Sequence, residues 1–466
     1  MQKVHFLGIA GVGMSATALL MKEAGWRVTG SDAECYGPPR EVLERGGISF
    51  ALGYKPENIP ANVDCFVIGR NVKLVPAENA EVRAALAGGK PIYSFPQVLG
   101  QLTKNRKNLV VAGSYGKSTI TALLAHILRH SGIDAGYFIG AKPVVSTWLP
   151  SPSSLGTAPF FVVEGDEYPS SHDDSRAKFM HLNPHDLILT SVVHDHVNVY
   201  PTFADYQKPF RELLALVPMG GLVVVCVDEP NVLALTEASG KRTVSYGVKS
   251  ASAMYRARNI SFGKQTEFEL IANETKLGNI TTALLGTHNV EDIVGAVAYL
   301  LSRGLVSFEQ IAAAVRDFKG VRRRLDNLAP SSTVPVFEGF GSSYEKARAA
   351  IEAIQRHYAT TPLVIVFEPH TFGWRNRANL AWYDNVFTGA SRVFVAPPEK
   401  QGATTHDQLT QEEILARVGS IAKPYTGPDG VLELLSGNEV VLILTSGDLN
   451  GTLSTLAAII NKKFTT

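Results

Sequence analysis

The sequence contains few cysteines and no excess of charge of either sign. Its three cysteines, Cys35, Cys65 and Cys226, lie far apart in a chain of 466 residues, which argues against a disulfide framework and against a CxxC metal site. The 44 basic and 43 acidic residues nearly cancel to a formal net charge of +1. We therefore expect no nucleic-acid partner and a reducing, cytoplasmic location.

Long hydrophobic runs are also absent. No apolar run reaches the roughly 18 residues that a membrane-spanning helix requires, and the apolar start at residues 4–21 is interrupted by glycines and small residues. It therefore does not match a secretory signal, and we expect no membrane association. Because domains typically hold about 100 to 200 residues, the length of the chain predicts about three of them.

Short apolar runs alternate with amphipathic stretches along the chain, which predicts an α/β fold with doubly wound, mostly parallel sheets. The runs expected to form strands lie at residues 4–7, 65–68, 91–94, 109–112, 160–163, 187–193, 222–227, 363–367, 393–396 and 440–444. A polar stretch at 102–108, expected to be a linker, and a proline-containing stretch at 318–335 separate three sets of elements. These breaks predict domains of residues 1–106, 107–328 and 329–466.

A glycine turn lies between a predicted strand and a predicted helix in VVAGSYGKST, residues 110–119. The pattern GxxxxGK[ST] would place its first glycine at position 111, where this chain has Val111. A glycine turn before a helix directs backbone N–H groups and the positive end of the helix dipole at an anion. Lys117 adds a charge and Ser118 a hydroxyl for magnesium. The alternative is a glycine turn with a solvated lysine.

Acidic residues and histidines follow two later predicted strands. Glu164, Asp166 and Glu167 come after one apolar run, and HDH at residues 194–196 comes after another. Carboxylate oxygens at the carboxyl end of a strand near a phosphate loop are suitable magnesium ligands, and of the three we expect Glu164 to take this role. A solvated acidic turn and structural histidines are the alternatives.

The opening GIAGVG at residues 8–13 is a second glycine turn after a predicted strand. Asp32 ends the next predicted strand, close to the distance of about 20 residues at which a dinucleotide-binding fold places its ribose-binding carboxylate. The GxxGxG spacing differs from the GxGxxG of that fold. Spacing alone therefore leaves dinucleotide binding open.

Together these segments resemble the Mur ligase family, the ATP-dependent amide-forming enzymes of peptidoglycan synthesis. The family loop reads GTxGK[ST][ST], shorter than the ordinary pattern, and GSYGKST resembles it. The family's tripeptide-recycling branch has a segment EADEYD…DKRSKFxHYRP, which EGDEYPSSHDDSRAKFMHLNPHDLIL resembles. Its HN and arginine motifs are similar to GTHNVEDIVGAVA and FKGVRRRLD. The missing glycine at position 111 is a family trait on this reading.

The resemblance implies a Rossmann-like first domain that binds UDP-N-acetylmuramate, a P-loop ATPase-like central domain that binds ATP and Mg²⁺, and a Rossmann-like third domain that binds the incoming amine. It implies that ATP converts a carboxylate to an acyl phosphate, which the amine then attacks. The implied acceptor is the murein tripeptide L-Ala-γ-D-Glu-meso-diaminopimelate, in peptidoglycan recycling. GIAGVGMSA also resembles the L-alanine-adding branch, so an amino acid, L-alanine, is the alternative. The oligomeric state stays open.

The resemblance assigns each predicted role to particular residues. The expected catalytic residues are Lys117, Glu164 and His196, and the expected magnesium ligands are Ser118, Glu164 and His196. The expected ATP-binding residues are Gly113, Ser114, Tyr115, Gly116, Lys117, Ser118, Thr119, His288, Asn289, Arg323 and Glu338. The expected UDP-sugar-binding residues are Gly8, Ile9, Ala10, Gly11, Val12, Gly13, Asp32 and Arg176, and the expected peptide-binding residues are His370 and Arg375.

One segment departs from the family pattern. Where the family has D[DY][FY][AG]H[HN]P, this chain has EGFGSSYEK, in which Glu338 replaces the first aspartate. A catalytically impaired protein that binds a UDP-sugar or a nucleotide is therefore a further hypothesis. Without the resemblance, Arg323 and Arg375 are as readily interpreted as solvated surface charges.

Overall fold

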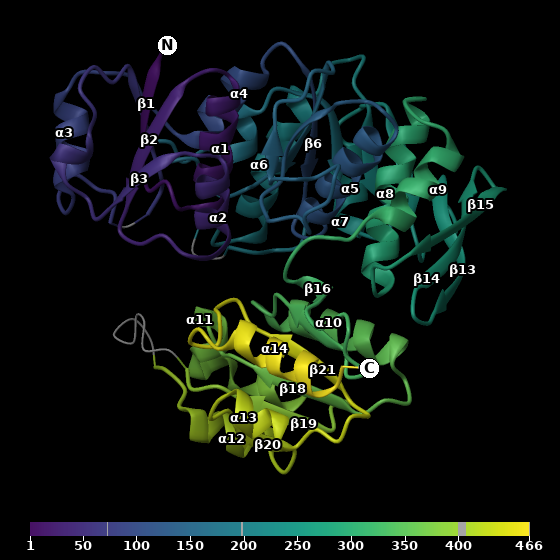
Figure 1. The fold of residues 1–466 in the computed structure, drawn as a ribbon. Helices are drawn as coiled ribbons and strands as arrows, with labels where there is room; N and C mark the ends of the chain where they lie inside the picture. Colours follow the sequence, from purple (N-terminus) through teal and green to yellow (C-terminus); the bar gives the residue numbers. More distant parts are fainter. Residues whose placement is uncertain (72, 197–198, 399–406, 466) are drawn as a thin grey trace. The chain divides into compact units, whose positions relative to one another are not determined.

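A computed structural model describes residues 1–71, 73–196, 199–398 and 407–465. The chain forms two compact units (Figure 1). The first comprises Met1–Asn259, Phe268–Ile280 and Glu291–Phe318, and the second comprises Ile260–Glu267, Thr281–Val290 and Lys319–Thr466. Three mostly parallel sheets with surrounding helices confirm the predicted α/β class. The domain boundaries at 106/107 and 328/329 stay a prediction.

The first sheet has strand order β3-β2-β1-β4-β5, and every pair in it is parallel. Its strands are β1 (Lys3–Leu7), β2 (Arg27–Asp32), β3 (Ser49–Leu52), β4 (Cys65–Ile68) and β5 (Ile92–Tyr93). Its helices are α1 (Val12–Glu23), α2 (Gly37–Arg45), the 3₁₀ turn η1 (Pro56–Asn58), α3 (Ala80–Ala87) and α4 (Phe95–Thr103). The strand order reverses between β1 and β4, so the crevice of this doubly wound sheet opens at the carboxyl ends of these two strands.

Both faces of this sheet are covered by helices. Alternate residues of β1 point to opposite faces, so they pack into two different cores. Val4 and Phe6 belong to a core shared with Met14 of α1 and Leu43 of α2. Leu7 belongs to a second core, built with residues of α3. Figure 1 shows α1 and α2 on one side of the strands and α3 on the other.

The second sheet has the order β15-β14-β13-β12-β11-β10-β6-β9-β7-β8. Its strands are β6 (Lys107–Ala112), β7 (Gly136–Phe138), β8 (Ser153–Ser154), β9 (Phe160–Gly165), β10 (Pro184–Leu189), β11 (Val223–Cys226), β12 (Thr243–Gly247), β13 (Tyr255–Phe262), β14 (Thr266–Ala272) and β15 (Thr275–Thr282). Its helices are α5 (Lys117–His130), the 3₁₀ turn η2 (Lys178–His181), α6 (Phe203–Leu216), α7 (Pro230–Glu237), α8 (Thr287–Ser302) and α9 (Phe308–Asp317).

Strand β6 lies in the interior of this sheet, parallel to both β9 and β10. Its residues Leu109, Val110 and Val111 are buried, as expected for a parallel strand covered on both faces. Two expectations are corrected here. The linker expected at 102–108 shrinks to 104–106, because α4 runs to Thr103 and β6 begins at Lys107. The strand expected at 187–193 ends at Leu189, and the residues after it bind the glycine turn instead.

The third sheet has the order β16-β17-β21-β18-β19-β20, and only the β16·β17 pair is antiparallel. Its strands are β16 (Arg324–Asn327), β17 (Val336–Gly339), β18 (Leu363–Phe367), β19 (Arg392–Val395), β20 (Ala422–Pro424) and β21 (Val440–Leu444). Its helices are α10 (Tyr344–His357), α11 (Phe372–Arg375), the 3₁₀ segment η3 (Arg377–Asp384), α12 (Gln411–Val418), α13 (Pro428–Leu432) and α14 (Leu453–Lys463).

This sheet also has a core on each face. Leu363, Ile365 and Phe367 pack into one core, and Val364 and Val366 pack into the other. Among the described residues, no helix combines the length and the apolar character that crossing a bilayer would need.

Candidate active site

The glycine turn lies where three neighbouring parallel strands end. Ala112 is the last residue of β6 and is in register with Gly165 of β9 and with Leu189 of β10. The segments that follow these strands therefore start at one edge of the sheet. Gly116 caps α5 with a φ of 79°, and the first turn of a helix leaves N–H groups without intrahelical partners. The turn thus presents a helix N-terminus, which favours an anion.

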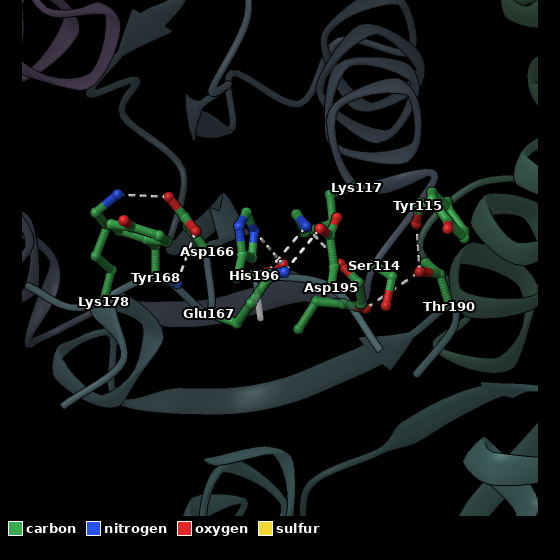
Figure 2. Close-up of polar contacts among 12 residues, drawn as sticks. Ser114, Tyr115, Lys117, Asp166, Glu167, Tyr168, Lys178, Thr190, Asp195 and His196 are labelled. Carbon is green, nitrogen blue, oxygen red and sulfur yellow. Dashed lines mark hydrogen bonds and ion pairs between the residues drawn. The ribbon is translucent and has the colours of Figure 1, made fainter. Parts of the chain in front are cut away.

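Hydrogen bonds from the segment after β10 hold this turn in place (Figure 2). The amide of Ser114 donates to the carbonyl of Ser191 at 3.0 Å, and the amide of Tyr115 donates to the hydroxyl of Ser191 at 2.9 Å. The hydroxyl of Thr190 donates to the carbonyl of Tyr115 at 2.5 Å. A Cβ on Gly113 would lie 2.1 Å from Thr190 Oγ1. Only glycine therefore fits at this position.

The side chain of Lys117 bridges the turn and a buried carboxylate. Its Nζ donates to the carbonyl of Gly113 at 2.5 Å and to Oε2 of Glu167 at 3.0 Å. The second oxygen of Glu167, Oε1, lies 3.3 Å from Nε2 of His196. The side chain of Glu167 is 2% exposed, whereas that of His196 is 34% exposed. Figure 2 shows Glu167 between the lysine and the histidine.

The charges in this cluster stabilise one another. Burial alone would raise the pKa of Glu167, but the ammonium of Lys117 and the hydrogen bond with His196 lower it to about 2. Burial opposes the charge of Lys117, but the carboxylates of Glu167, Asp166 and Glu164 outweigh it and raise the pKa of this lysine. The hydrogen bond to Glu167 raises the pKa of His196. A charged ammonium therefore lies in the phosphate-loop turn.

Glu164, the carboxylate expected to bind magnesium, has a different environment. It lies within β9, opposite Val111, and its Oε2 accepts the amide of Gly140 at 2.7 Å. The carboxylate that pairs with Lys117 is Glu167, two residues beyond the end of the strand. Glu167 stood in the same acidic segment, but the sequence did not show which carboxylate faces the lysine.

The remaining residues of the two acidic segments support the loops. Asp166 binds Nζ of Lys178 at 2.6 Å, and Tyr168 contacts the ring of His196 edge-on at 5.1 Å. Asp195 accepts the amide of His196 at 2.7 Å. These contacts fix the loop on which His196 lies. The backbone of His196 is in the left-handed region, with a φ of 53°.

The predicted magnesium ligands come from three segments of the chain: the first turn of α5, strand β9 and the residues after β10. Glu164 and His196 have different partners, and no group of three or more His, Cys, Asp or Glu side chains in the described part of the chain has the arrangement of a metal site. Ser118 lies in the first turn of α5. Magnesium commonly takes only one or two carboxylates together with phosphate oxygens and water, so the donor set around Lys117 fits a magnesium-bound phosphate. The ligand set stays a prediction.

The opening glycine turn of the first sheet is held by the strand beside it. The amides of Gly8 and Ile9 donate to the carbonyl of Ser31 at 2.9 and 3.1 Å. Gly11 caps α1, and Val12, its first residue, is 45% exposed. A Cβ on Gly13 would lie 2.8 Å from the ring of Phe95.

Asp32 binds this glycine turn with one carboxylate oxygen and the side chain of Tyr54 with the other. Oδ2 accepts the amide of Ala10 at 2.8 Å, and Oδ1 accepts the hydroxyl of Tyr54 at 3.0 Å. Both oxygens of Asp32 therefore accept hydrogen bonds from the protein itself. This disfavours a role for Asp32 in binding the ribose of a dinucleotide.

Arg176, predicted to contact the UDP-sugar, forms a bidentate pair with Asp174 at 2.9 and 2.8 Å. His181 binds the same carboxylate at 3.0 Å. Hydrogen bonds to Arg176 lower the pKa of Asp174 to about 2. The arginine side chain is 61% exposed. Asp174 therefore orients its guanidinium without burying it.

Four of the residues predicted to bind ATP belong to the second unit. His288 is exposed, and the side-chain amide of Asn289 donates to the carbonyl of Leu285 at 2.7 Å. Arg323 Nε donates to Oε1 of Glu338 at 2.7 Å. Burial raises the pKa of Glu338 even though the guanidinium opposes this shift.

Arg323 also binds the turn after β21. Its Nη1 donates to the carbonyl of Ser446 at 3.4 Å, and its Nη2 donates to that of Gly447. Since Gly339 of β17 is in register with Leu444 of β21, Glu338 lies at the carboxyl edge of the third sheet. The segment that departs from the family pattern therefore provides the buried carboxylate of Glu338. This carboxylate anchors Arg323, the arginine that binds the turn after β21.

Of the two predicted peptide-binding residues, His370 lies near the same turn, and Arg375 is the last residue of α11. A Cβ on Gly447 would be 2.7 Å from Nδ1 of His370 and 2.5 Å from Oε2 of Glu368. Thr445 donates to that oxygen of Glu368. Arg375 is 8% exposed. Glu368 was not expected from the sequence, although it follows the last residue of β18 and stands two positions before His370.

Comparisons with known proteins identify the family. Residues 3–107 match the Mur ligase family catalytic domain, and residues 111–300 match the Mur ligase middle domain. UDP-N-acetylmuramate–L-alanine ligase of Aquifex aeolicus is 30% identical over 452 residues, covering 96% of each chain. The chain belongs to the Mur ligase family. It is therefore an ATP-dependent, amide-bond-forming ligase, as the sequence predicted.

Two solved Mur ligase structures share the three-domain fold. The L-alanine ligase MurC of Thermotoga maritima superposes with a TM-score of 0.80 at 22% identity, covering 99% of this chain and 100% of that one. The murein peptide ligase Mpl of Psychrobacter arcticus superposes with a TM-score of 0.71 at 25% identity, covering 99% of each chain.

These comparisons overturn one prediction. The tripeptide acceptor and the recycling role were expected from the resemblance to the tripeptide-recycling branch, but the Aquifex relative matches nearly the whole chain and carries the name of an L-alanine ligase. The structural match is also better to MurC than to Mpl. The tripeptide prediction is therefore wrong, and the L-alanine alternative is the better supported.

Proposed function

We propose that this protein joins L-alanine to the carboxylate of UDP-N-acetylmuramate, with conversion of ATP to ADP and phosphate. The observation that carries the proposal is the similarity to an L-alanine ligase over 96% of both chains. The phosphate-loop turn with its charged lysine supports the ATP-dependent part, since Lys117 lies at the N-terminus of α5.

ATP would supply the phosphoryl group that turns a carboxylate oxygen into a leaving group. Lys117 would hold the β- and γ-phosphates, together with the first-turn amides of α5. Ser118, Glu164 and His196 stay the predicted magnesium ligands, and the proposal adds Glu167, because this carboxylate lies between Lys117 and His196. These groups act by positioning and by stabilising negative charge, which is the main task in phosphoryl transfer.

The other two sheets would bring the remaining substrates. The glycine turn after β1 and the N-terminus of α1 form an anion-binding edge suited to the diphosphate of UDP-N-acetylmuramate. In the third sheet, His370 and Arg375 are the proposed contacts for the carboxylate of the amino acid, because a guanidinium matches a carboxylate bidentately. The cytoplasmic location stays a prediction.

The test is phosphate release from ATP with UDP-N-acetylmuramate and a panel of amines: L-alanine, glycine, L-serine and the murein tripeptide. We expect release that depends on both UDP-N-acetylmuramate and L-alanine, with the amide product confirmed by mass spectrometry. Release with the tripeptide alone would contradict the proposed acceptor. Tight binding of the UDP-sugar without release with any amine would support the impaired protein instead.

A further inference from the structure

A buried tyrosine that no sequence motif indicated lies beside the phosphate-loop turn. Tyr206 is fully buried; its hydroxyl lies 2.9 Å from the hydroxyl of Ser114 and donates to Oε1 of Glu167 at 3.3 Å. Ser114 belongs to the turn, and Glu167 holds Lys117. One phenol therefore connects the turn with the carboxylate that binds the lysine.

The position of this hydroxyl is fixed by the start of α6. Thr202 and Asp205 form a capping box, in which Thr202 Oγ1 accepts the amide of Asp205 at 3.2 Å and Asp205 Oδ2 accepts that of Thr202 at 3.1 Å. The ring of Tyr206 packs edge-on against Tyr200 at 5.5 Å and Phe210 at 5.3 Å. A rigid helix and packed rings hold a functional group precisely enough to orient a neighbour.

The hydroxyls of Ser114 and Tyr206 can each donate only one hydrogen bond, and this limit couples Ser114 to Glu167. A serine or tyrosine hydroxyl has one hydrogen, and an ionised carboxylate only accepts. The amide of Val193 donates to Ser114 Oγ at 2.9 Å, and the same Oγ lies 2.8 Å from the carbonyl of Val193. When Tyr206 donates to Glu167, it can only accept from Ser114. When Tyr206 donates to Ser114, Glu167 loses this donor.

We propose that Tyr206 is a positioning residue for nucleotide binding. It holds the carboxylate of Glu167 when the ammonium of Lys117 turns from this carboxylate to a nucleotide phosphate, and it keeps Ser114 in place in the turn. A buried carboxylate that loses its cation needs other donors, because an uncompensated buried charge is strongly destabilising. The inference rests on the proposed function only in taking ATP as the nucleotide.

The test compares Tyr206→Phe with Tyr299→Phe as the matched control. Tyr299 is also a buried tyrosine of the first unit, and its hydroxyl donates to Asp186 at 2.9 Å. The dissociation constant of ATP with Mg²⁺ is measured by calorimetry, and the KM values of ATP and UDP-N-acetylmuramate by initial rates. We expect Tyr206→Phe to weaken ATP binding roughly tenfold, as loss of a hydrogen bond to a charged group does. The KM of the UDP-sugar should not change, and Tyr299→Phe should leave both values within about twofold, because its bond lies outside the loop network.

A double-mutant cycle with Ser114→Ala distinguishes positioning from a general loss of stability. If Tyr206 acts partly through Ser114, the double variant binds ATP no more weakly than about the worse single variant. If the losses of ATP affinity in the two single variants add up in the double variant, Tyr206 does not act through Ser114. Should Tyr206→Phe fail to fold, Ser114→Ala and Ser114→Thr carry the test, and only the variant without a hydroxyl should weaken ATP binding.

The inference is overturned if Tyr206→Phe binds ATP as the wild type does, or if Tyr299→Phe weakens binding by the same factor. It also fails if the wild type does not bind ATP. A wild type that binds ATP but forms no product with L-alanine would contradict the proposed function alone, since the binding comparison still tests Tyr206.

Discussion

The ammonium of Lys117 lies 3.0 Å from the carboxylate of Glu167, although 50 positions separate the two residues in the chain. The contact exists because β6 and β9 are neighbouring parallel strands, so that their following segments start at the same edge of the sheet. Both side chains are largely buried, at 15% and 2% exposure. The pair therefore links the phosphate-loop turn to the acidic segment.

Lys117→Ala should lower kcat/KM for ATP roughly a hundredfold, since a charged hydrogen bond contributes about 1.5–3 kcal/mol. The matched control is Lys241→Ala, because Lys241 also donates to a backbone carbonyl, that of Val217, at 2.5 Å. Phosphate release is measured with both substrates present. Unchanged turnover in Lys117→Ala would remove the basis of the proposed phosphate site.

Gly113→Ala should destabilise the fold and abolish ATP binding, because its Cβ would lie 2.1 Å from Thr190 Oγ1 and 2.8 Å from the amide nitrogen of Ser191. The control is Gly132→Ala, where φ is +85° and no atom lies within 4 Å. Only backbone strain of about 1 kcal/mol is expected there. Urea unfolding and ATP titration measure both variants, and equal losses would show that close packing at Gly113 does not matter.

The free energy of unfolding should depend on Glu167 in acid. The folded protein lowers the pKa of this carboxyl from 4.5 to about 2, so the folded state binds fewer protons than the unfolded state between these values. The stabilisation is therefore fully present above about pH 5 and is lost as the pH falls towards 2, an effect on the order of 3 kcal/mol.

Glu167→Gln removes this titration. The difference in unfolding free energy between the wild type and Glu167→Gln should shrink as the pH falls from about 5 to about 2. Urea unfolding at a series of pH values measures it. A difference that stays constant over this range would show that Glu167 is not held ionised by its neighbours.

Asp32→Ala should raise the KM of UDP-N-acetylmuramate about tenfold and leave the KM of ATP unchanged, because the carboxylate fixes the amide of Ala10 in the glycine turn and a charged hydrogen bond is lost. Asp64→Ala is the control, since Asp64 accepts the amide of Lys3 at the other end of β1. An effect on ATP alone would argue against a UDP-sugar site at this turn.

Arg323→Met should destabilise the protein by about 3 kcal/mol or more, because it leaves the buried carboxylate of Glu338 without its cation. Adding Glu338→Gln to this variant should restore part of the loss, since the amide carries no charge. Urea unfolding of the two single variants and the double variant measures the coupling. Additive losses would mean that the ion pair does not hold the turn after β21.

Much of the fold could be predicted from local patterns. The runs at 363–367 and 440–444 form strands with the predicted bounds, because a short, continuous, branched apolar run is stable only where both faces are covered. The glycine turn before Lys117 was predictable for a similar reason, since a strand, a glycine turn and a helical pattern follow one another directly. The segment after Leu189 was mistaken for strand, because apolar composition does not show where backbone pairing stops.

The site was harder to predict than the fold. Glu164 and Glu167 stand three residues apart in one acidic segment, and the choice between them depends on where β9 ends and on which way its side chains alternate. Tyr206 comes from a helix with no motif of its own. The acceptor was predicted wrongly from the resemblance to the tripeptide-recycling branch, and only the comparison with whole relatives favoured L-alanine.

The sequence by itself determined the α/β class, the order of the elements and the phosphate-loop turn, because each depends on neighbouring residues: hydrophobic period, glycine position and helix start. Only the tertiary structure decided that Lys117 pairs with Glu167, that Tyr206 connects Glu167 to Ser114, and that Glu338 anchors Arg323. These contacts join residues that are distant in the chain, and they form because parallel strands bring their carboxyl ends to one edge of a sheet, where burial makes each charge depend on its partner.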